Sequence, residues 1–188
     1  GNNNIAQSMF QQMAHERHAV PRWVVVGAGT GGTSATIGRY IRYQRQATQL
    51  CVADPQGSVF SAYHASGDAT ITGPGSRIEG IGRPRVEPSF VRTLVDRMDE
   101  VQDVDSIVAM RALSALLGRR VGPSTGTNFV AMLRLAQEMR ARGEQGSILS
   151  LLCDAGERYL PTYHDADWVR RCMGDCAAAE QRLREQLA

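Results

Sequence analysis

The sequence contains no lysine, and its 21 basic residues are all arginines. A lysine amine is the side chain that forms a Schiff base with a carbonyl compound, and arginine does not replace it because its guanidinium stays protonated. The side chains of this chain therefore exclude any reaction that begins with such a covalent bond. A functional hypothesis that needs this amine must find it elsewhere.

The sequence also lacks long apolar runs, and its formal net charge is only +2. No run reaches the roughly 20 apolar residues that cross a bilayer, so we expect no membrane partner. A charge this small gives no reason to expect nucleic acid as a partner. No signal-peptide pattern opens the chain, and we expect a cytoplasmic protein.

The cysteines and histidines do not form a metal-binding or redox pattern. Cys51 and Cys153 lie in apolar, strand-like runs and are expected to be buried thiols. Cys172 and Cys176 are four residues apart, which places both on one face of a predicted helix rather than in a CxxC motif. Two histidines on a predicted N-terminal helix have no third ligand nearby. We expect no metal and a reducing compartment.

Apolar runs of strand length alternate with helical patterns along the chain. The first strand, helix and strand form a βαβ unit, which implies a parallel sheet. An irregular stretch rich in glycine, proline and serine covers 56–88, and its length is typical of a functional loop. The predicted fold class is α/β, with a mostly parallel sheet flanked by helices. The predicted strands are 23–26, 50–53 and 148–152, and the predicted helices are 5–20, 32–45, 106–117, 127–142 and 165–187.

The stretch VVVGAGTGGT, at 24–33, runs from a predicted strand through a glycine-rich turn into a predicted helix. Gly27, Gly29 and Gly32 satisfy the pattern G-x-G-x-x-G, and Asp54 ends the next strand. That arrangement is the dinucleotide fingerprint, in which the carboxylate binds a ribose. One hypothesis is therefore a non-catalytic Rossmann module that binds NAD or FAD.

Further features favour a single phosphate instead. A second loop, GPSTG at 122–126, lies at another predicted strand-to-helix junction, and two such loops can converge on one ligand. Thr30 and Thr33 add hydroxyl donors, which suit the acceptor oxygens of a terminal phosphate. The stretch IEGIG, at 78–82, adds a flexible backbone segment. Together these features favour a compact phosphorylated ring held between two loops.

Four motifs follow one another along the chain: GTGGT at 29–33, EGIG at 79–82, GPSTG at 122–126 and GERYL at 156–160. In this order and spacing they resemble the cysteine synthase and cystathionine β-synthase family of pyridoxal-phosphate (PLP) enzymes. The variants GNNNIA, IEGIGRPRVEPSF and GPSTGTN are most similar to the L-cysteine desulfhydrase branch found in actinobacteria. The resemblance implies PLP as cofactor and the tryptophan-synthase-β-like fold, also called fold type II.

The resemblance also implies which residues form the site, with no metal among them. Ser124 would form a hydrogen bond with the pyridine nitrogen, and Gly80 and Gly82 would lie near the amino-acid substrate. Backbone N–H groups, hydroxyls and a helix N-terminus would bind the phosphate at Gly29, Thr30, Gly31, Gly32 and Thr33. All of 1–188 would be the C-terminal part of the PLP-binding catalytic domain, with a phosphate loop at 27–33, a substrate loop at 56–90 and a pyridine-nitrogen loop at 122–126.

A serine at the pyridine nitrogen has a chemical consequence. A carboxylate there would hold the nitrogen protonated and make the ring a strong electron sink, whereas a neutral hydroxyl does not. That favours β-elimination over transamination. The resemblance implies L-cysteine as substrate, with sulfide, pyruvate and ammonia as products. The alternative is β-replacement, as in cysteine synthase or cystathionine β-synthase. Arg83 and Arg85 replace the small and aromatic residues of synthases. We interpret them as loop-surface charges, and the alternative is contact with the substrate or with the missing half.

The Schiff-base lysine of this family, and its substrate-carboxylate loop, belong to an N-terminal region that has no counterpart in this sequence. We therefore expect the chain to be the C-terminal half of an enzyme and to be inactive alone. We also expect the missing half to cover one side of the sheet. The resemblance further implies a homodimer.

Overall fold

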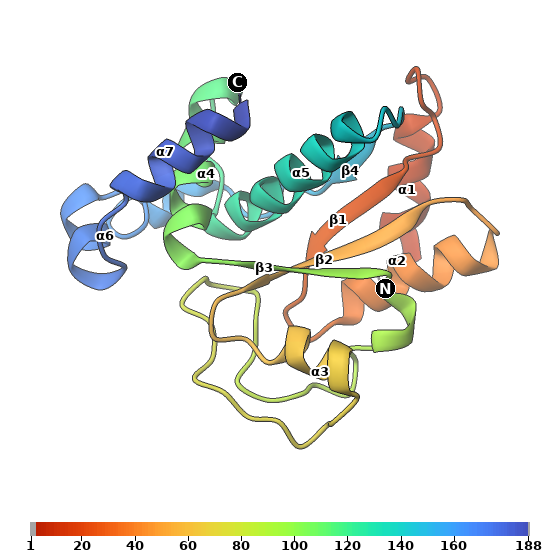
Figure 1. Ribbon diagram of the computed structural model, residues 1–188, viewed down its shortest axis with the longest axis horizontal. Helices are drawn as coiled ribbons and strands as arrows, with labels where there is room; N and C mark the ends of the chain where they lie inside the picture. The colour runs from red at the N-terminus through yellow and green to blue at the C-terminus, as the bar shows by residue number, and fades with distance from the viewer. Residues whose placement is uncertain (1–2, 188) are drawn as a thin grey trace.

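The sheet of this protein is built from parallel strands (Figure 1). The structure, a computed structural model, describes residues 3–187. β1 pairs with both β2 and β4, and β2 pairs with β3, each in parallel register. The predicted α/β fold class is thus confirmed. The strands are β1 (Trp23–Gly27), β2 (Gln49–Pro55), β3 (Arg97–Val101) and β4 (Ile148–Ser150), in the sheet order β3-β2-β1-β4.

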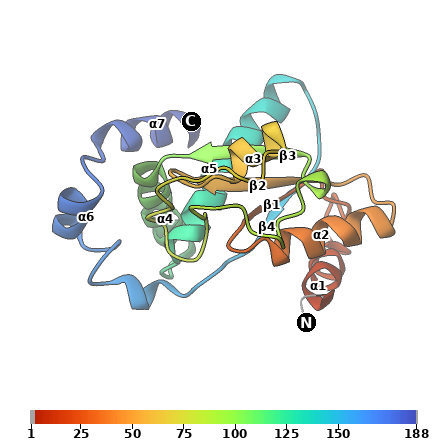
Figure 2. The same cartoon turned by 90° about the horizontal axis from the view of Figure 1, so that it is seen from below.

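Helices cover both faces of the sheet and extend beyond one of its ends. α6 and α7 lie beside α4 at one end of the molecule, and α1 and α2 lie at the other (Figures 1 and 2). The helices are α1 (Asn3–Met13), α2 (Gly32–Tyr43), α3 (Phe60–Ser66), α4 (Asp103–Leu117), α5 (Pro123–Ala141), α6 (Ala166–Cys172) and α7 (Ala177–Leu187), with 3-10 turns η1 (Arg92–Leu94) and η2 (Gly156–Tyr159).

The core lies on both sides of β1 and β2, whose side chains alternate between the two faces. Val24 and Val26 pack with Ile37 of α2 on one face. Val25 packs with Leu135 of α5 on the other. These three valines are at most 1% exposed. Such apolar runs are typical of parallel strands covered on both sides. The chain's own helices therefore cover both faces, contrary to the expectation that a missing half covers one of them.

One strand and one α-helix were absent from the sequence prediction. β3 was not predicted because its sequence, RMDEV, mixes charged and apolar residues at the edge of the sheet. It pairs with β2, with Cys51 opposite Arg97 and Asp99 opposite Ala53. α3 falls inside the stretch predicted to be irregular, and it ends at Gly67, whose φ is 77°. The rest of that stretch has little regular structure.

The C-terminal helix predicted as continuous is instead two helices. Asp165 caps α6 by accepting a hydrogen bond from the Trp168 N–H. Gly174, with φ of 107°, lies between α6 and α7, where the chain changes direction. Cys172 and Cys176 therefore do not share one helix face. Cys153 is exposed rather than buried, and Cys51 is buried as predicted.

Among residues 3–187, no helix is both long enough and apolar enough to cross a membrane. The same residues contain no group of three or more histidine, cysteine, aspartate or glutamate side chains arranged to hold a metal ion.

Candidate functional site

A cavity of about 310 Å³ opens at the carboxyl ends of β1 and β4. The chain proceeds from β1 through β2 to β3 on one side, and β4 then joins the opposite edge of β1. Ligands of parallel α/β sheets bind at such a reversal of strand order, because the loops on its two sides separate there. The volume is at the lower end of the range for small-molecule sites, roughly 300–1,000 Å³.

The loop between β1 and α2 forms one wall of the cavity, and all five predicted phosphate-binding residues, 29–33, line it. Gly31 is the N-cap of α2 and has φ of 91°, a conformation that favours glycine. A Cβ at Gly31 would also contact the backbone of Phe90. No side chain caps the start of α2. The N–H groups of a first helical turn have no partner within the helix and can bind an anion.

The second predicted loop is the start of a helix, not a separate turn. α5 begins at Pro123, so Ser124 lies in its first turn, and Ser124 is 7% exposed and lines the cavity. Nor does a strand of the sheet precede it, because the chain enters from α4 through Val121. Two contacts attach this turn to the end of β4: Gly122 N–H donates to the Asp154 carbonyl (2.9 Å), and Cys153 N–H donates to Thr125 Oγ1 (3.0 Å).

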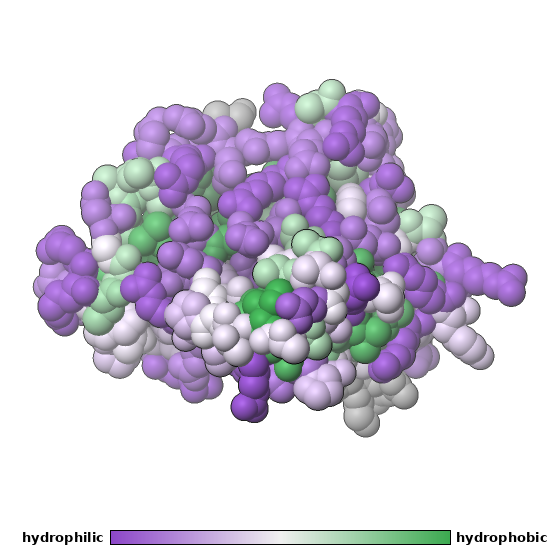
Figure 3. Space-filling model, turned by 60° about the horizontal axis from the view of Figure 1, so that its bottom comes forward, coloured by the Kyte–Doolittle hydropathy of each residue, from purple (hydrophilic) through white to green (hydrophobic). Residues whose placement is uncertain are grey.

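Of the two glycines predicted to lie near a substrate, the structure places only one at the cavity. Gly80 lines it, together with Glu79 and Ile81. Gly82 is buried behind this wall, where its N–H donates to the Ala28 carbonyl at 2.8 Å. Gly82 therefore shapes the loop without facing the cavity. Figure 3 shows the side of the molecule that carries the irregular region, where near-neutral residues and a small hydrophobic group lie at the centre and many of the residues around them are hydrophilic.

Sequence reasoning missed five polar residues that line the cavity. Ser34 and Glu79 adjoin residues that were predicted, whereas Asn128, Cys153 and Asp154 do not. Asn128 is 1% exposed and lies one helical turn after Ser124, so the i, i+4 spacing was an available signal. Its side-chain oxygen is buried without a hydrogen-bond partner among the described residues. Cys153 and Asp154 follow β4, and no pattern in the sequence linked that strand end to the glycine loop.

A charged cluster borders the cavity on the side of the GERYL motif. Arg158 forms ion pairs with Glu79 (2.7 Å) and Asp154 (3.4 Å), and these side chains are all more than half exposed. The Tyr159 hydroxyl donates to Asp154 at 2.7 Å. Burial, assisted by this hydrogen bond, raises the pKa of Tyr159 above its usual value, so the phenol stays neutral. The two acidic residues at this rim are thus paired with one arginine.

Asp54, the carboxylate of the dinucleotide hypothesis, does not line the cavity. It is 1% exposed, and its Oδ2 accepts a hydrogen bond from the Ser61 N–H of α3 (2.8 Å). Burial raises its pKa. Arg85 forms an ion pair with the partly buried Glu87, and Arg83 donates to the Gly82 carbonyl. Neither arginine is among the residues that line the cavity. Asp54 therefore binds the backbone of α3 and does not face a ligand in the cavity.

Comparison with known proteins gives consistent matches. The sequence profile of the family described as "Pyridoxal-phosphate dependent enzyme" matches residues 1–154. L-cysteine desulfhydrase Cds1 of Mycobacterium tuberculosis is 59% identical over 170 residues, covering 90% of this chain and 46% of that protein. Cysteine synthase 2 of Schizosaccharomyces pombe is 30% identical over 181 residues, covering 90% and 44%. The chain thus spans less than half the length of these relatives.

One solved structure has the same arrangement of elements. The crystal structure of an O-acetylserine dependent cystathionine β-synthase from Helicobacter pylori matches with a TM-score of 0.68 and 28% sequence identity, over 86% of this chain and 49% of that chain. The resemblance and the fold type expected from the four motifs are thereby confirmed.

Proposed function

The chain belongs to the family of pyridoxal-phosphate dependent enzymes, and we propose that its cavity binds PLP with the phosphate at the N-terminus of α2. Three features fit the phosphate. The start of α2 has no side-chain cap, Thr30 and Thr33 add hydroxyls beside it, and Gly29 leaves the backbone accessible. A Cβ at Gly29 would lie 2.6 Å from the Gly80 carbonyl oxygen, so a larger residue would close this wall.

Ser124 fits the ring nitrogen because it lines the same cavity from the start of α5. Bound PLP would supply the electron sink that makes the α-proton of an amino acid acidic. Ser124 would donate a neutral hydrogen bond to the nitrogen and leave it without a full positive charge. Gly80 would lie beside the substrate, and Gly82 would hold the bend of that loop.

The reaction that we propose is β-elimination on L-cysteine. One cysteine and one water give one sulfide, one pyruvate and one ammonia. The Cα–H and Cβ–S bonds break, and the sulfur leaves as sulfide. The 59% identity to an L-cysteine desulfhydrase is the observation that carries this proposal.

β-Replacement is the alternative, in which a nucleophile adds to the β-carbon in place of hydrolysis. It is supported by the cysteine synthase relative at 30% identity and by the similarity to a solved cystathionine β-synthase. The lower identity makes it the second candidate.

We propose that the Schiff-base lysine comes from the part of the enzyme corresponding to the remaining length of the relatives. The chain has no lysine of its own, and it covers 46% of the desulfhydrase. The role of residues 1–188 would be to bind the phosphate and the ring nitrogen of PLP. The covalent bond to PLP would form with a residue outside 1–188. On this proposal the chain alone does not turn over cysteine.

The intact enzyme, supplied with L-cysteine, is expected to release sulfide and pyruvate in equal amounts, and both can be measured by colorimetric and coupled assays.

Ser124→Ala should slow this release by about 10- to 100-fold while PLP absorbance is retained, because one hydrogen bond to the ring is lost. Thr33→Val should weaken PLP retention instead. Cysteine formation from O-acetylserine and sulfide, without pyruvate from cysteine, would contradict the lyase proposal and support the alternative.

We propose that the enzyme is a homodimer that acts in the cytoplasm. The four cysteines are all free, which fits a reducing compartment. Light scattering of the intact enzyme and cell fractionation would test these two statements separately.

A further inference from the structure

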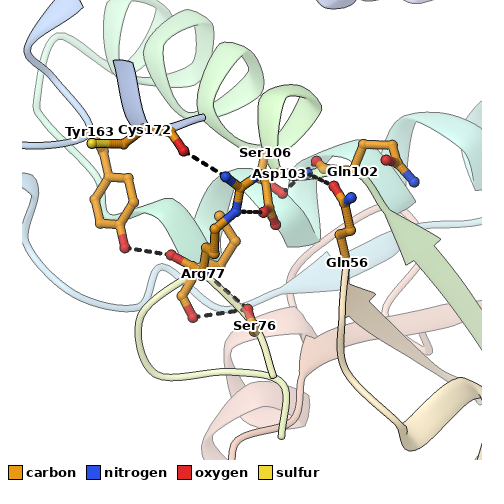
Figure 4. Close-up of polar contacts among 9 residues, drawn as sticks. Gln56, Ser76, Arg77, Gln102, Asp103, Ser106, Tyr163 and Cys172 are labelled. Atoms are coloured by element: carbon orange, nitrogen blue, oxygen red, sulfur yellow. Dashed lines mark hydrogen bonds and ion pairs between the residues drawn. The ribbon is translucent and has the colours of Figure 1, made fainter. Parts of the chain in front are cut away.

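The segment that carries Gly80 is attached at its start by Arg77 (Figure 4). Arg77 Nε donates to Oδ2 of Asp103, in the first turn of α4, at 2.7 Å. Its Nη1 donates to the Cys172 carbonyl at the end of α6 at 2.5 Å. The Tyr163 hydroxyl donates to the backbone carbonyl of Arg77 at 2.8 Å. Both the side chain and the backbone of Arg77 are therefore bound.

The apolar side chains of the same segment pack against the C-terminal part of the chain. Ile78 and Ile81 are 2% and 8% exposed, in one cluster with Tyr163 and Val169. Tyr163 also packs edge-on against Trp168, with ring centroids 5.2 Å apart. This cluster helps to bury the two isoleucines on either side of Gly80, and Ile81 also lies against Gly27 at the end of β1.

The segment gains from such attachment because two of its residues are glycines, whose backbone is costly to order. Gly80 and Gly82 have φ of 88° and 74°, and glycine loses more conformational freedom on ordering than any other residue. Contacts on both sides of Gly80 reduce the number of conformations that remain. Tyr163 and Cys172 lie after residue 154, beyond the part of the chain that matches the family profile.

We infer that Arg77 and Tyr163 are positioning residues that hold Gly80 and Ile81 at the wall of the cavity and thereby set the affinity for the amino-acid substrate. This inference rests on the proposed function. The phosphate-binding wall at 29–33 belongs to a different loop, which contacts this segment through its near end, where the Gly82 N–H donates to the Ala28 carbonyl and Gly29 lies against Gly80. We therefore expect the two residues to affect substrate binding more than cofactor binding.

A matched pair of variants tests the inference, since Arg77→Met and Arg182→Met each remove an ion pair to the first turn of α4. Arg182 pairs with Asp105 at 2.5 Å, and the two arginine side chains are equally exposed at 50%. Arg182 lies on α7 and does not contact the segment. In the intact enzyme, Arg77→Met should raise KM for L-cysteine about five- to ten-fold, with smaller changes in kcat and in PLP affinity. Arg182→Met should leave KM unchanged.

Tyr163→Phe is the second variant, because Arg77→Met leaves the nearly buried Asp103 carboxylate without its cation. It removes the hydrogen bond to the Arg77 carbonyl and keeps the ring in the cluster. It should raise KM in the same direction by about two- to five-fold. An unchanged KM in both Arg77→Met and Tyr163→Phe, or an equal rise in Arg182→Met, would overturn the inference.

Amide hydrogen exchange separates this inference from the proposed function. In the intact enzyme without substrate, the amides of 78–82 should exchange faster in Arg77→Met and Tyr163→Phe than in Arg182→Met. If the wild-type enzyme releases no sulfide, the proposed function fails, and exchange still tests the attachment. Equal exchange in all three variants would refute the attachment itself.

Discussion

Residues around the cavity divide into those that face its interior and those that support its walls. Ser124 and Gly80 face it, whereas Gly82 and Asp54 are buried behind the lining. Asp54 shows how a residue type can mislead. Its place after a strand fits a ribose ligand, yet its carboxylate accepts a hydrogen bond from the backbone of α3. A carboxylate at a strand end is available to a ligand only when neighbouring elements leave it exposed.

Asp54→Asn should change the pH dependence of stability and leave cofactor binding unchanged. Burial raises the folded-state pKa of Asp54 above its usual value, so the folded protein binds this proton more tightly than the unfolded chain does. The wild type therefore loses stability as pH rises from about 3.9 through the folded-state pKa. The asparagine oxygen can still accept a hydrogen bond from the Ser61 N–H. Because asparagine does not ionise, the variant does not lose stability in this way as pH rises. At pH 7 it should be at least as stable as wild type, within about 1 kcal/mol.

Urea unfolding of both proteins at pH 4 and pH 7 would measure this difference, since all other groups are shared. A greater stability deficit of the variant at pH 7 than at pH 4 would contradict the assignment, and so would weakened PLP binding by the variant.

Packing between two helices determines where Ser124 lies. α4 and α5 approach closely at Gly126, where a Cβ would overlap the Ser106 carbonyl oxygen and lie 2.8 Å from the Met110 backbone nitrogen. Thr127 Oγ1 also donates to Ser106 Oγ at 2.9 Å across this contact. Ser124 and Gly126 both lie near the start of α5. Because Gly126 has no side chain, this end of α5 can approach α4, and the approach places the Ser124 hydroxyl at the cavity.

Gly126→Ala should destabilise the protein by about 2–4 kcal/mol, because backbone rather than a flexible side chain must move. The gain of about 1 kcal/mol from the better helix propensity of alanine does not offset this. Gly143→Ala is the control. Gly143 has φ of 64° with no atom within 4 Å of a Cβ, so only backbone strain, about 1 kcal/mol, is expected. Urea denaturation of the two variants measures both values, and equal losses would contradict the packing argument.

At the scale of the whole molecule, the chain supplies both coverings of its sheet and the loops that line the cavity. α1 and α2 pack on one face, α5 packs on the other, and the central valines are buried between them. The missing component is chemical, because no lysine is present. The chain by itself is therefore expected to fold and yet to lack the covalent bond to the cofactor.

Treatment of the isolated chain with PLP and then borohydride should leave no side chain of 1–188 modified, since the α-amino group is its only amine. In the intact enzyme the added mass should appear on a lysine outside this range. Peptide mapping by mass spectrometry measures both.

The isolated chain should also unfold in one cooperative transition, because its core is covered on both faces. A broad, non-cooperative transition would show that the covered core needs a further partner.

The sequence by itself determined the strands β1 and β2, the glycine loop between β1 and α2, and the family resemblance, because these depend on local patterns. Val24, Val25 and Val26 are apolar in succession, and the glycines that follow them tolerate the positive φ that the chain adopts at Gly31. The identity of Ser124 as a site residue also came from its motif. Local patterns did not reveal β3, whose charged residues are held by pairing with β2.

Only the tertiary structure decided which segments meet. Asn128 and Cys153 line the cavity because α5 packs beside the end of β4. Arg77 and Tyr163 are 86 residues apart in sequence, and their contact arises from the packing of the C-terminal part against α4 and the glycine segment. Contacts between residues distant in sequence depend on how the helices and the sheet pack in three dimensions, and the local pattern of residues along the chain does not specify that packing.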